Sequence, residues 1–175
     1  MQRIEYSGLG EIFTAAGDAT DLDACLATYD EQLGRTALFD TVFVDAPCSG
    51  TGTMRRHGEI PWRLTPQECD RDLPELQLEL LREAACRVGT GGQLIYATCS
   101  VLRAENSHVV TQFLGSPEGE GFAPMPLSDA LAAAGPAYSG AAADIAAHEI
   151  PIGTFQSYPH QGGFDGHFCA RFVRV

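Results

Sequence analysis

Apolar residues along the chain fall into short continuous runs and into longer stretches with helical spacing. The runs Phe39–Val44 and Gln93–Ala97 are too short for helices, and each predicts a buried strand. Between them, Leu73–Val88 carries apolar residues at a spacing of three to four, which predicts a helix. Thr65–Glu68 provides its start, with Thr as the cap, Pro next and Glu three residues on. This order predicts a strand–helix–strand unit whose strands are parallel.

Weaker patterns predict the elements on either side of this unit. The short apolar run Glu11–Ala16 is closed by a Gly-Asp turn and is expected to form a strand. The spacings in Leu22–Leu33 and Glu105–Leu114 predict helices. The segment Gly115–Ala147 is rich in Pro, Gly and Ala and is expected to be a partly mobile insertion. In Gly163–Val175, phenylalanines alternate with polar residues, which predicts a final strand preceded by a turn.

Length and composition indicate a single cytoplasmic domain over residues 1–175. The chain has 175 residues, 45% of them hydrophobic, which is enough for one core and too few for two ordinary domains. No apolar run reaches the length of a membrane span, and no basic-then-apolar leader begins the chain, so we expect neither secretion nor membrane insertion. The six cysteines form no C-x-x-C pair, and the histidines lack metal-ligand spacing. We therefore expect reduced thiols and no metal.

The charge balance bears on nucleic-acid binding. A net charge of −12 and a pI near 4.6 argue against the chain gripping a phosphate backbone unaided. Positive charge concentrates only at Arg55, Arg56, His57 and Arg63. If RNA is bound, we expect Arg55 and Arg56 to contact it. The alternative is that these arginines are simply solvated.

Two cysteines carry the chemistry that the sequence suggests. Cys48 and Cys99 each follow one of the predicted buried strands. Residues just past the carboxyl ends of parallel strands line the ligand crevice of an open sheet, so both thiols should face one site. A thiolate is a nucleophile, and the Asp45 carboxylate can accept hydrogen bonds from a bound amino group. This arrangement is typical of an enzyme.

These motifs resemble those of the RNA cytosine-C5 methyltransferases of the Sun/RsmB type, from about Gly17 to the end of the chain. The resemblance is carried by Asp45–Gly52, Gln77 with Leu80 and Leu81, Gly91–Ser100, Glu105 with Asn106, and Phe164–Phe168. It implies an α/β, Rossmann-like methyltransferase fold, with a mostly parallel sheet and an antiparallel strand near the end. The family's first two strands, its glycine-rich cofactor loop and its upstream RNA-binding region have no counterpart in this sequence.

The resemblance also implies a mechanism with S-adenosylmethionine as cofactor and RNA as substrate. Cys99 would be the nucleophile that adds to C6 of a cytosine, so that C5 takes the methyl group. Cys48 would help to remove the C5 proton or to release the adduct. Asp45 would hold the target base or the methionine end of the cofactor. Asp18 would match the carboxylate near the adenine, although it is also a plausible turn former. The target base would have to leave its stack.

Two alternatives stay open. DNA cytosine methyltransferases use the cysteine of their Pro-Cys motif as the nucleophile, which would assign the attack to Cys48. The context of Cys99 in Ala97–Ser100 favours Cys99 instead. The chain could also be a catalytically silent fragment or interaction module that keeps the fold but cannot bind cofactor.

The missing strands have a structural consequence. Without them, Phe39–Val44 has a bare edge, and a bare strand edge pairs readily with another strand. Either Glu11–Ala16 moves over to cover it, or a second copy of the chain does. We therefore predict a rearranged monomer or an edge-paired homodimer.

Overall fold

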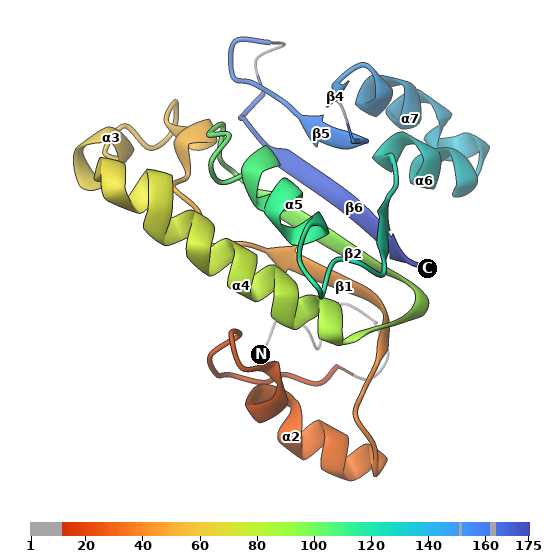
Figure 1. The fold of residues 1–175 in the computed structure, drawn as a ribbon. Helices are drawn as coiled ribbons and strands as arrows, with labels where there is room; N and C mark the ends of the chain where they lie inside the picture. Colours follow the sequence, from red (N-terminus) through yellow and green to blue (C-terminus); the bar gives the residue numbers. More distant parts are fainter. Residues whose placement is uncertain (1–11, 151, 162–163) are drawn as a thin grey trace. The chain divides into compact units, whose positions relative to one another are not determined.

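The computed structural model describes residues 12–150, 152–161 and 164–175 (Figure 1). The chain forms two compact units, Met1–Ala37 and Leu38–Val175. Across the described residues, no helix has both the length and the apolar character that a membrane crossing requires.

In the first unit, the predicted helix is found with its predicted bounds as α2 (Leu22–Leu33). The Asp21 carboxylate caps it by accepting a hydrogen bond from the Ala24 amide, and Gly34 ends it in the left-handed conformation. The strand predicted over Glu11–Ala16 is wrong for residues 12–16, which form neither strand nor helix, and residue 11 lies outside the described part. Instead of pairing in a sheet, this segment packs Phe13 against Tyr29 of α2, with ring centroids 5.0 Å apart.

The second unit is built on a mixed sheet with the order β1-β2-β6-β5-β4, and β3 pairs with β6. The β1–β2 pair is parallel, and the other described pairs are antiparallel. The strands are β1 (Phe39–Asp45), β2 (Val88–Thr98), β3 (Phe122–Pro124), β4 (Glu149–Ile150), β5 (Thr154–Gln156) and β6 (Phe168–Arg174). The α/β class is confirmed, as is the antiparallel strand near the end of the chain. The antiparallel part of the described sheet is larger than the sequence analysis expects.

The predicted strand–helix–strand unit is confirmed. Helix α4 (Leu73–Cys86) connects the parallel strands β1 and β2. Its start is the predicted capping box, in which the Thr65 amide and hydroxyl donate to Glu68 at 2.7 and 2.8 Å. A π-helical turn over Glu68–Asp72 leads into the helix.

Further helices connect the remaining strands. Helix α5 (Ser107–Leu114) lies within the helix predicted after Cys99, and α3 (Ile60–Arg63) is one short turn before α4. The segment expected to be a partly mobile insertion forms β3, α6 (Leu127–Ala133) and α7 (Ser139–Ala146). Alanine-rich stretches favour helices even where their apolar periodicity is weak.

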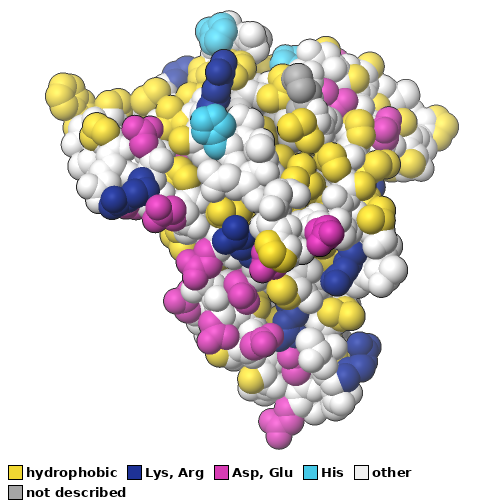
Figure 2. Space-filling model, in the orientation of Figure 1, with side chains coloured by type: hydrophobic (Ala, Val, Ile, Leu, Met, Phe, Trp, Pro, Cys, Tyr) yellow, Lys and Arg dark blue, Asp and Glu magenta, His cyan; other side chains and the backbone are white. Residues whose placement is uncertain are grey.

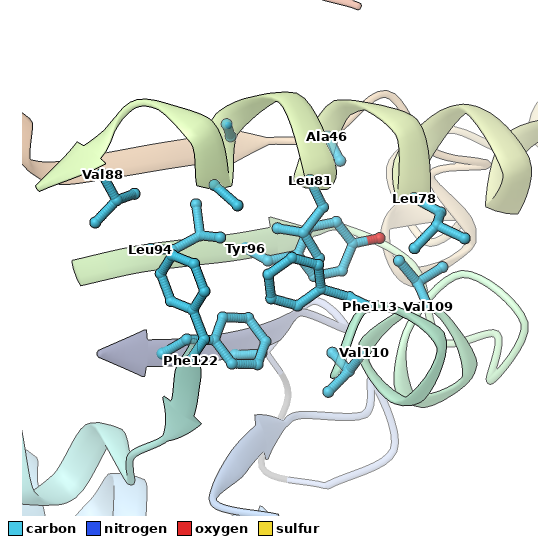
Figure 3. Packing of buried hydrophobic residues seen from close by; sticks show 14 of the residues in the cluster. Ala46, Leu78, Leu81, Val88, Leu94, Tyr96, Val109, Val110, Phe113 and Phe122 are labelled. Carbon is cyan, nitrogen blue, oxygen red and sulfur yellow. The ribbon is translucent and has the colours of Figure 1, made fainter. Parts of the chain in front are cut away.

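The hydrophobic core lies between the sheet and the two helices α4 and α5, which cover the same face (Figure 1). Leu81 of α4 and Phe113 of α5 point toward Leu94 and Tyr96 of β2 (Figure 3). These four side chains are fully buried, as is Phe172 of β6. Each such side chain contributes roughly 1.5–3 kcal/mol to folding. The core therefore fixes β2, the strand that ends directly before Cys99.

Strand β2 is buried as predicted, whereas the prediction that β1 is buried is wrong. Within the described sheet β1 pairs only with β2, so it lies at an edge. Its side chains alternate between half-buried and exposed, and Phe43 is 60% exposed. The Glu11–Ala16 run does not cover this edge as a strand, because residues 12–16 are not extended in the sheet.

Candidate functional site

The structure brings the two motif cysteines together. Strands β1 and β2 run in the same direction, and Asp45 pairs with Ala97 at their carboxyl ends. Cys48 follows β1 by three residues, and Cys99 follows β2 directly. Their Sγ atoms are 3.3 Å apart, which is hydrogen-bonding distance for sulfur. The thiols therefore form one pair at the edge of the sheet where α/β proteins bind ligands.

The surroundings of Cys48 disfavour its ionisation. Burial raises the pKa of Cys48 from its ordinary value of 9.0 to about 12, and the hydrogen bond with Cys99 adds to the rise. Cys48 therefore keeps its proton at neutral pH. As a protonated thiol it can donate that proton in a hydrogen bond to the Cys99 sulfur.

Backbone hydrogen bonds lock the cysteine loops to the segment before β6. The Gly52 amide donates to the Cys99 carbonyl, and the Gly166 amide donates to the Gly52 carbonyl, both at 2.9 Å. A Cβ atom added to Gly52 would overlap the Gly166 backbone. This close approach requires glycine at position 52 and joins the Phe164–Phe168 motif to the thiol pair.

A buried carboxylate ties the two cysteine loops to helix α4. Glu105 is fully buried and accepts hydrogen bonds from the Ser49 amide at 2.8 Å, the Ser100 hydroxyl at 2.8 Å and the Gln77 amide nitrogen at 3.0 Å. Gln77 also donates to the carbonyl of Pro47 at 2.9 Å. Ser49 and Ser100 each directly follow a cysteine. Glu105 therefore sets the position of both thiols.

The positioning role of Glu105 was missed by the sequence analysis, which cites Glu105 and Gln77 only as parts of the family resemblance. The available signal was an acidic residue six positions after Cys99, at the start of a predicted helix. Asn106 plays a similar part beside it. It accepts from the Thr98 hydroxyl at 2.7 Å and donates to the Ser100 carbonyl at 2.9 Å.

The candidate substrate residues Arg55 and Arg56 both face Asp165. Arg56 forms an ion pair with this carboxylate, and a nitrogen of Arg55 lies 3.6 Å from it. The arginine side chains are about 60% exposed, whereas Asp165 is 12% exposed. One carboxylate thus faces two guanidinium groups. This leaves a net positive charge next to the backbone contact between Gly52 and Gly166.

The two candidate aspartates have different environments. Asp45 is exposed at the carboxyl end of β1, beside the thiol pair in sequence. Asp18 belongs to the first unit, where its carboxylate accepts from the Thr20 amide at 3.0 Å and the Thr20 hydroxyl at 2.8 Å. These bonds lower the pKa of Asp18. Asp18 therefore forms the turn that precedes α2.

A hollow of about 600 Å³ lies next to the Phe164–Phe168 motif. It is lined mainly by apolar atoms, with contributions from His148, Phe155, Phe164, Asp165 and His167. Within the described ranges, no group of three or more His, Cys, Asp and Glu side chains is placed to hold a metal ion.

Known proteins are similar to this chain in sequence. The family model described as 16S rRNA methyltransferase RsmB/F matches residues 3–173. Ribosomal RNA small subunit methyltransferase B of Pectobacterium atrosepticum is 36% identical over 149 residues, which cover 83% of this chain and 29% of the relative. The protein of the same name from Escherichia coli is 46% identical over 89 residues, covering 49% and 20%. The chain thus spans less than a third of the length of these relatives.

Solved structures show the same fold. A methyltransferase homolog protein from Pyrococcus horikoshii superposes with a TM-score of 0.67 at 19% identity, covering 99% of this chain and 48% of that protein. NSun6 from the same organism gives a TM-score of 0.67 at 20% identity, covering 99% and 37%. At these identities, the two structures support the Rossmann-like fold.

Proposed function

The chain belongs to the 16S rRNA methyltransferase RsmB/F family, and we propose that it is the catalytic part of an S-adenosylmethionine-dependent RNA cytosine-C5 methyltransferase. The observation that carries this proposal is the Cys48–Cys99 thiol pair, 3.3 Å apart at the carboxyl ends of two parallel strands. Methylation at C5 through a covalent adduct requires one thiol that attacks, and it benefits from a second that assists its departure.

Cys99 is proposed as the nucleophile. Its thiolate forms a bond to C6 of an extruded cytosine, which makes C5 electron-rich enough to take a methyl group. A protonated Cys48 supports this assignment, because its S–H can donate a hydrogen bond that stabilises negative charge on the Cys99 sulfur. The DNA methyltransferase pattern would require Cys48 to ionise first, and its raised pKa disfavours that.

Cys48 is proposed to act at the release step. Once C5 carries the methyl group, a solvent water takes the C5 proton, the electron pair of that C–H bond restores the double bond between C5 and C6, and the bond between C6 and the Cys99 sulfur breaks. The sulfur departs as a thiolate. A Cys48 thiol that keeps its own proton at neutral pH cannot accept the C5 proton. It is well suited to donate a hydrogen bond to the departing Cys99 thiolate. Of the two roles that the resemblance allows for Cys48, the structure therefore favours adduct release.

The residues present fit the cofactor in part. S-adenosylmethionine, when bound, supplies a methyl group on a positively charged sulfur. The exposed Asp45 carboxylate has the chemistry to accept hydrogen bonds from the amino group at the methionine end, or from the target base. Asp18 is proposed for the adenine end on the family resemblance alone. Its Oδ1 atom already accepts both bonds from Thr20.

RNA contact is proposed at Arg55 and Arg56, whose exposed guanidinium groups lie next to the motif that holds the thiol loops. The opposite charge covers α4, where acidic side chains gather in Figure 2. Glu75, Glu79 and Glu83 of this helix, with Glu118, line a hollow there that holds a single basic side chain, Arg82. Phosphates would be repelled from that face. In a protein as long as these relatives, the segments outside this chain would supply further affinity for RNA.

We also propose a cytoplasmic location. The six cysteines are thiols rather than disulfides in the structure, and thiols persist in a reducing compartment. The reaction at Cys99 needs such a compartment, because an oxidised sulfur cannot attack cytosine.

The second candidate function is a catalytically silent interaction module. It is favoured by the two hydrogen bonds from Thr20 that engage the Asp18 carboxylate and by the exposed apolar side chain of Phe43 on β1. Calorimetric titration of S-adenosylmethionine into the chain separates the two functions. The methyltransferase proposal predicts saturable binding that Asp45→Ala weakens at least ten-fold. Asp40→Ala, an exposed aspartate on the same strand, serves as the matched control and should bind like the wild type. No heat up to millimolar cofactor would support the silent module.

A further inference from the structure

We propose that Cys48 and Cys99 are also a site of reversible oxidative modification, at which hydrogen peroxide converts the thiol pair into an intramolecular disulfide. The consequence for activity rests on the function proposed above, because the disulfide would occupy the sulfur that attacks cytosine. The modification itself follows from the geometry of the pair alone.

The distance between the sulfur atoms permits this bond. The Sγ atoms are 3.3 Å apart, and a disulfide is about 2.04 Å long, so they need to approach by about 1.3 Å. Small side-chain rotations supply such a movement. The loops that carry the cysteines are already held together by the Gly52–Cys99 backbone bond and by the shared contacts of Ser49 and Ser100 with Glu105.

The chemistry balances with peroxide as the oxidant. The Cys99 thiolate attacks one oxygen of hydrogen peroxide, the O–O bond breaks, and the other oxygen leaves as hydroxide and is protonated to water. Cys99 is then a sulfenic acid. The Cys48 proton passes to the sulfenic acid oxygen as the Cys48 sulfur attacks the Cys99 sulfur, the S–O bond breaks, and a second water leaves. The two thiols lose two electrons and two protons, and one peroxide becomes two waters.

The position of Cys48 determines the outcome of oxidation. A sulfenic acid that meets no thiol is oxidised further to sulfinic acid, which dithiol reductants do not reverse. Cys48 lies in hydrogen-bonding contact with Cys99 and is half-buried with it, so it can trap the sulfenic acid before a second peroxide reaches it. Cys48 thereby protects Cys99 from irreversible damage. A dithiol reductant then restores both thiols.

Peptide mapping tests the modification without RNA or cofactor. The protein is treated with hydrogen peroxide, its remaining thiols are blocked with N-ethylmaleimide, and it is digested without reductant for mass spectrometry. We expect a species in which a disulfide links the Cys48 peptide to the Cys99 peptide. Its mass is that of the two peptides together less two hydrogen atoms, and it disappears after treatment with dithiothreitol. In Cys48→Ser, we expect Cys99 to become sulfinic acid that dithiothreitol does not recover. Cys86→Ser, at an exposed thiol in α4, should behave like the wild type.

Wild-type protein in which Cys99 becomes sulfinic acid while Cys48 remains free for N-ethylmaleimide would overturn the proposal, as would a link from either residue to another cysteine. A second measurement addresses activity. Peroxide treatment should reduce the covalent trapping of RNA that contains 5-azacytidine at least ten-fold, with recovery after dithiothreitol. Full trapping by protein shown to carry the disulfide would refute the inhibitory consequence. Absence of trapping in untreated protein would count against the proposed function and leave the peptide map standing.

Discussion

At the scale of single residues, the environment of Cys48 makes its reactivity depend on Cys99. Burial and the neighbouring thiol both raise the pKa of Cys48, to about 12. Only the thiolate is alkylated, so a raised pKa means slower alkylation at a given pH. In the wild type, the alkylation rate of Cys48 by iodoacetamide should keep rising with pH to near 12. In Cys99→Ala the contribution of Cys99 to the raised pKa is lost while burial remains. The midpoint of the pH profile of Cys48 alkylation should therefore move to lower pH but stay above 9.0. An unchanged pH profile, measured by mass spectrometry at Cys48, would contradict this account.

A second residue-scale prediction concerns Glu105. Glu105→Ala would leave three donors without their acceptor in a buried region: the Ser49 amide, the Ser100 hydroxyl and the Gln77 side chain. Each such loss costs roughly 1–3 kcal/mol, so we expect a decrease in unfolding free energy of about 3 kcal/mol or more. Urea denaturation followed by circular dichroism measures this. Glu79→Ala, at an exposed position of α4, should change it by less than about 0.5 kcal/mol. Equal effects of the two substitutions would refute a positioning role for Glu105.

At the scale of elements, the site depends on the contact between the Cys48 loop and the segment before β6. Gly52→Ala places a methyl group against the Gly166 backbone, which must then move away. We expect a loss of roughly 1–3 kcal/mol in unfolding free energy and a lower yield of the Cys48–Cys99 disulfide. The matched control is Gly58→Ala in the same loop, where an added Cβ meets no atom within 4 Å. Thermal unfolding and peptide mapping measure the two effects. A Gly52→Ala protein as stable as Gly58→Ala would show that the contact is not needed.

The elements that sequence predicted correctly are those set by local patterns. The bounds of α2, the capping box before α4 and the parallel strand–helix–strand unit all follow from spacing and end signals. The thiol pair followed too, because the carboxyl ends of parallel strands meet at one edge. Burial of β1 could not be predicted locally, since it depends on which strands lie beside it. The contacts of Glu105 with Ser49 and of Arg56 with Asp165 join residues far apart in the chain, and no periodicity reports such contacts.

At the scale of the whole molecule, the edge of β1 bears on the oligomeric state. Phe43 of β1 is 60% exposed, although it is a large apolar side chain. We propose that a second copy of the chain packs against this exposed side chain to form a homodimer. Light scattering after gel filtration should give twice the mass of the 18.7 kDa chain, and Phe43→Lys should shift it toward the monomer. A wild-type monomer whose β1 amides exchange rapidly with deuterium would refute the dimer.

The proposed methyl transfer depends on Cys99 forming a covalent bond to cytosine, and trapping with RNA that contains 5-azacytidine tests this most directly. The wild type and Cys48→Ala should form an adduct that survives denaturing electrophoresis, with the RNA mapped to Cys99. Cys99→Ala should form none, and Cys86→Ser should match the wild type. An adduct that persists in Cys99→Ala and disappears in Cys48→Ala would show that Cys48 is the nucleophile. That result would contradict the mechanism proposed for this thiol pair.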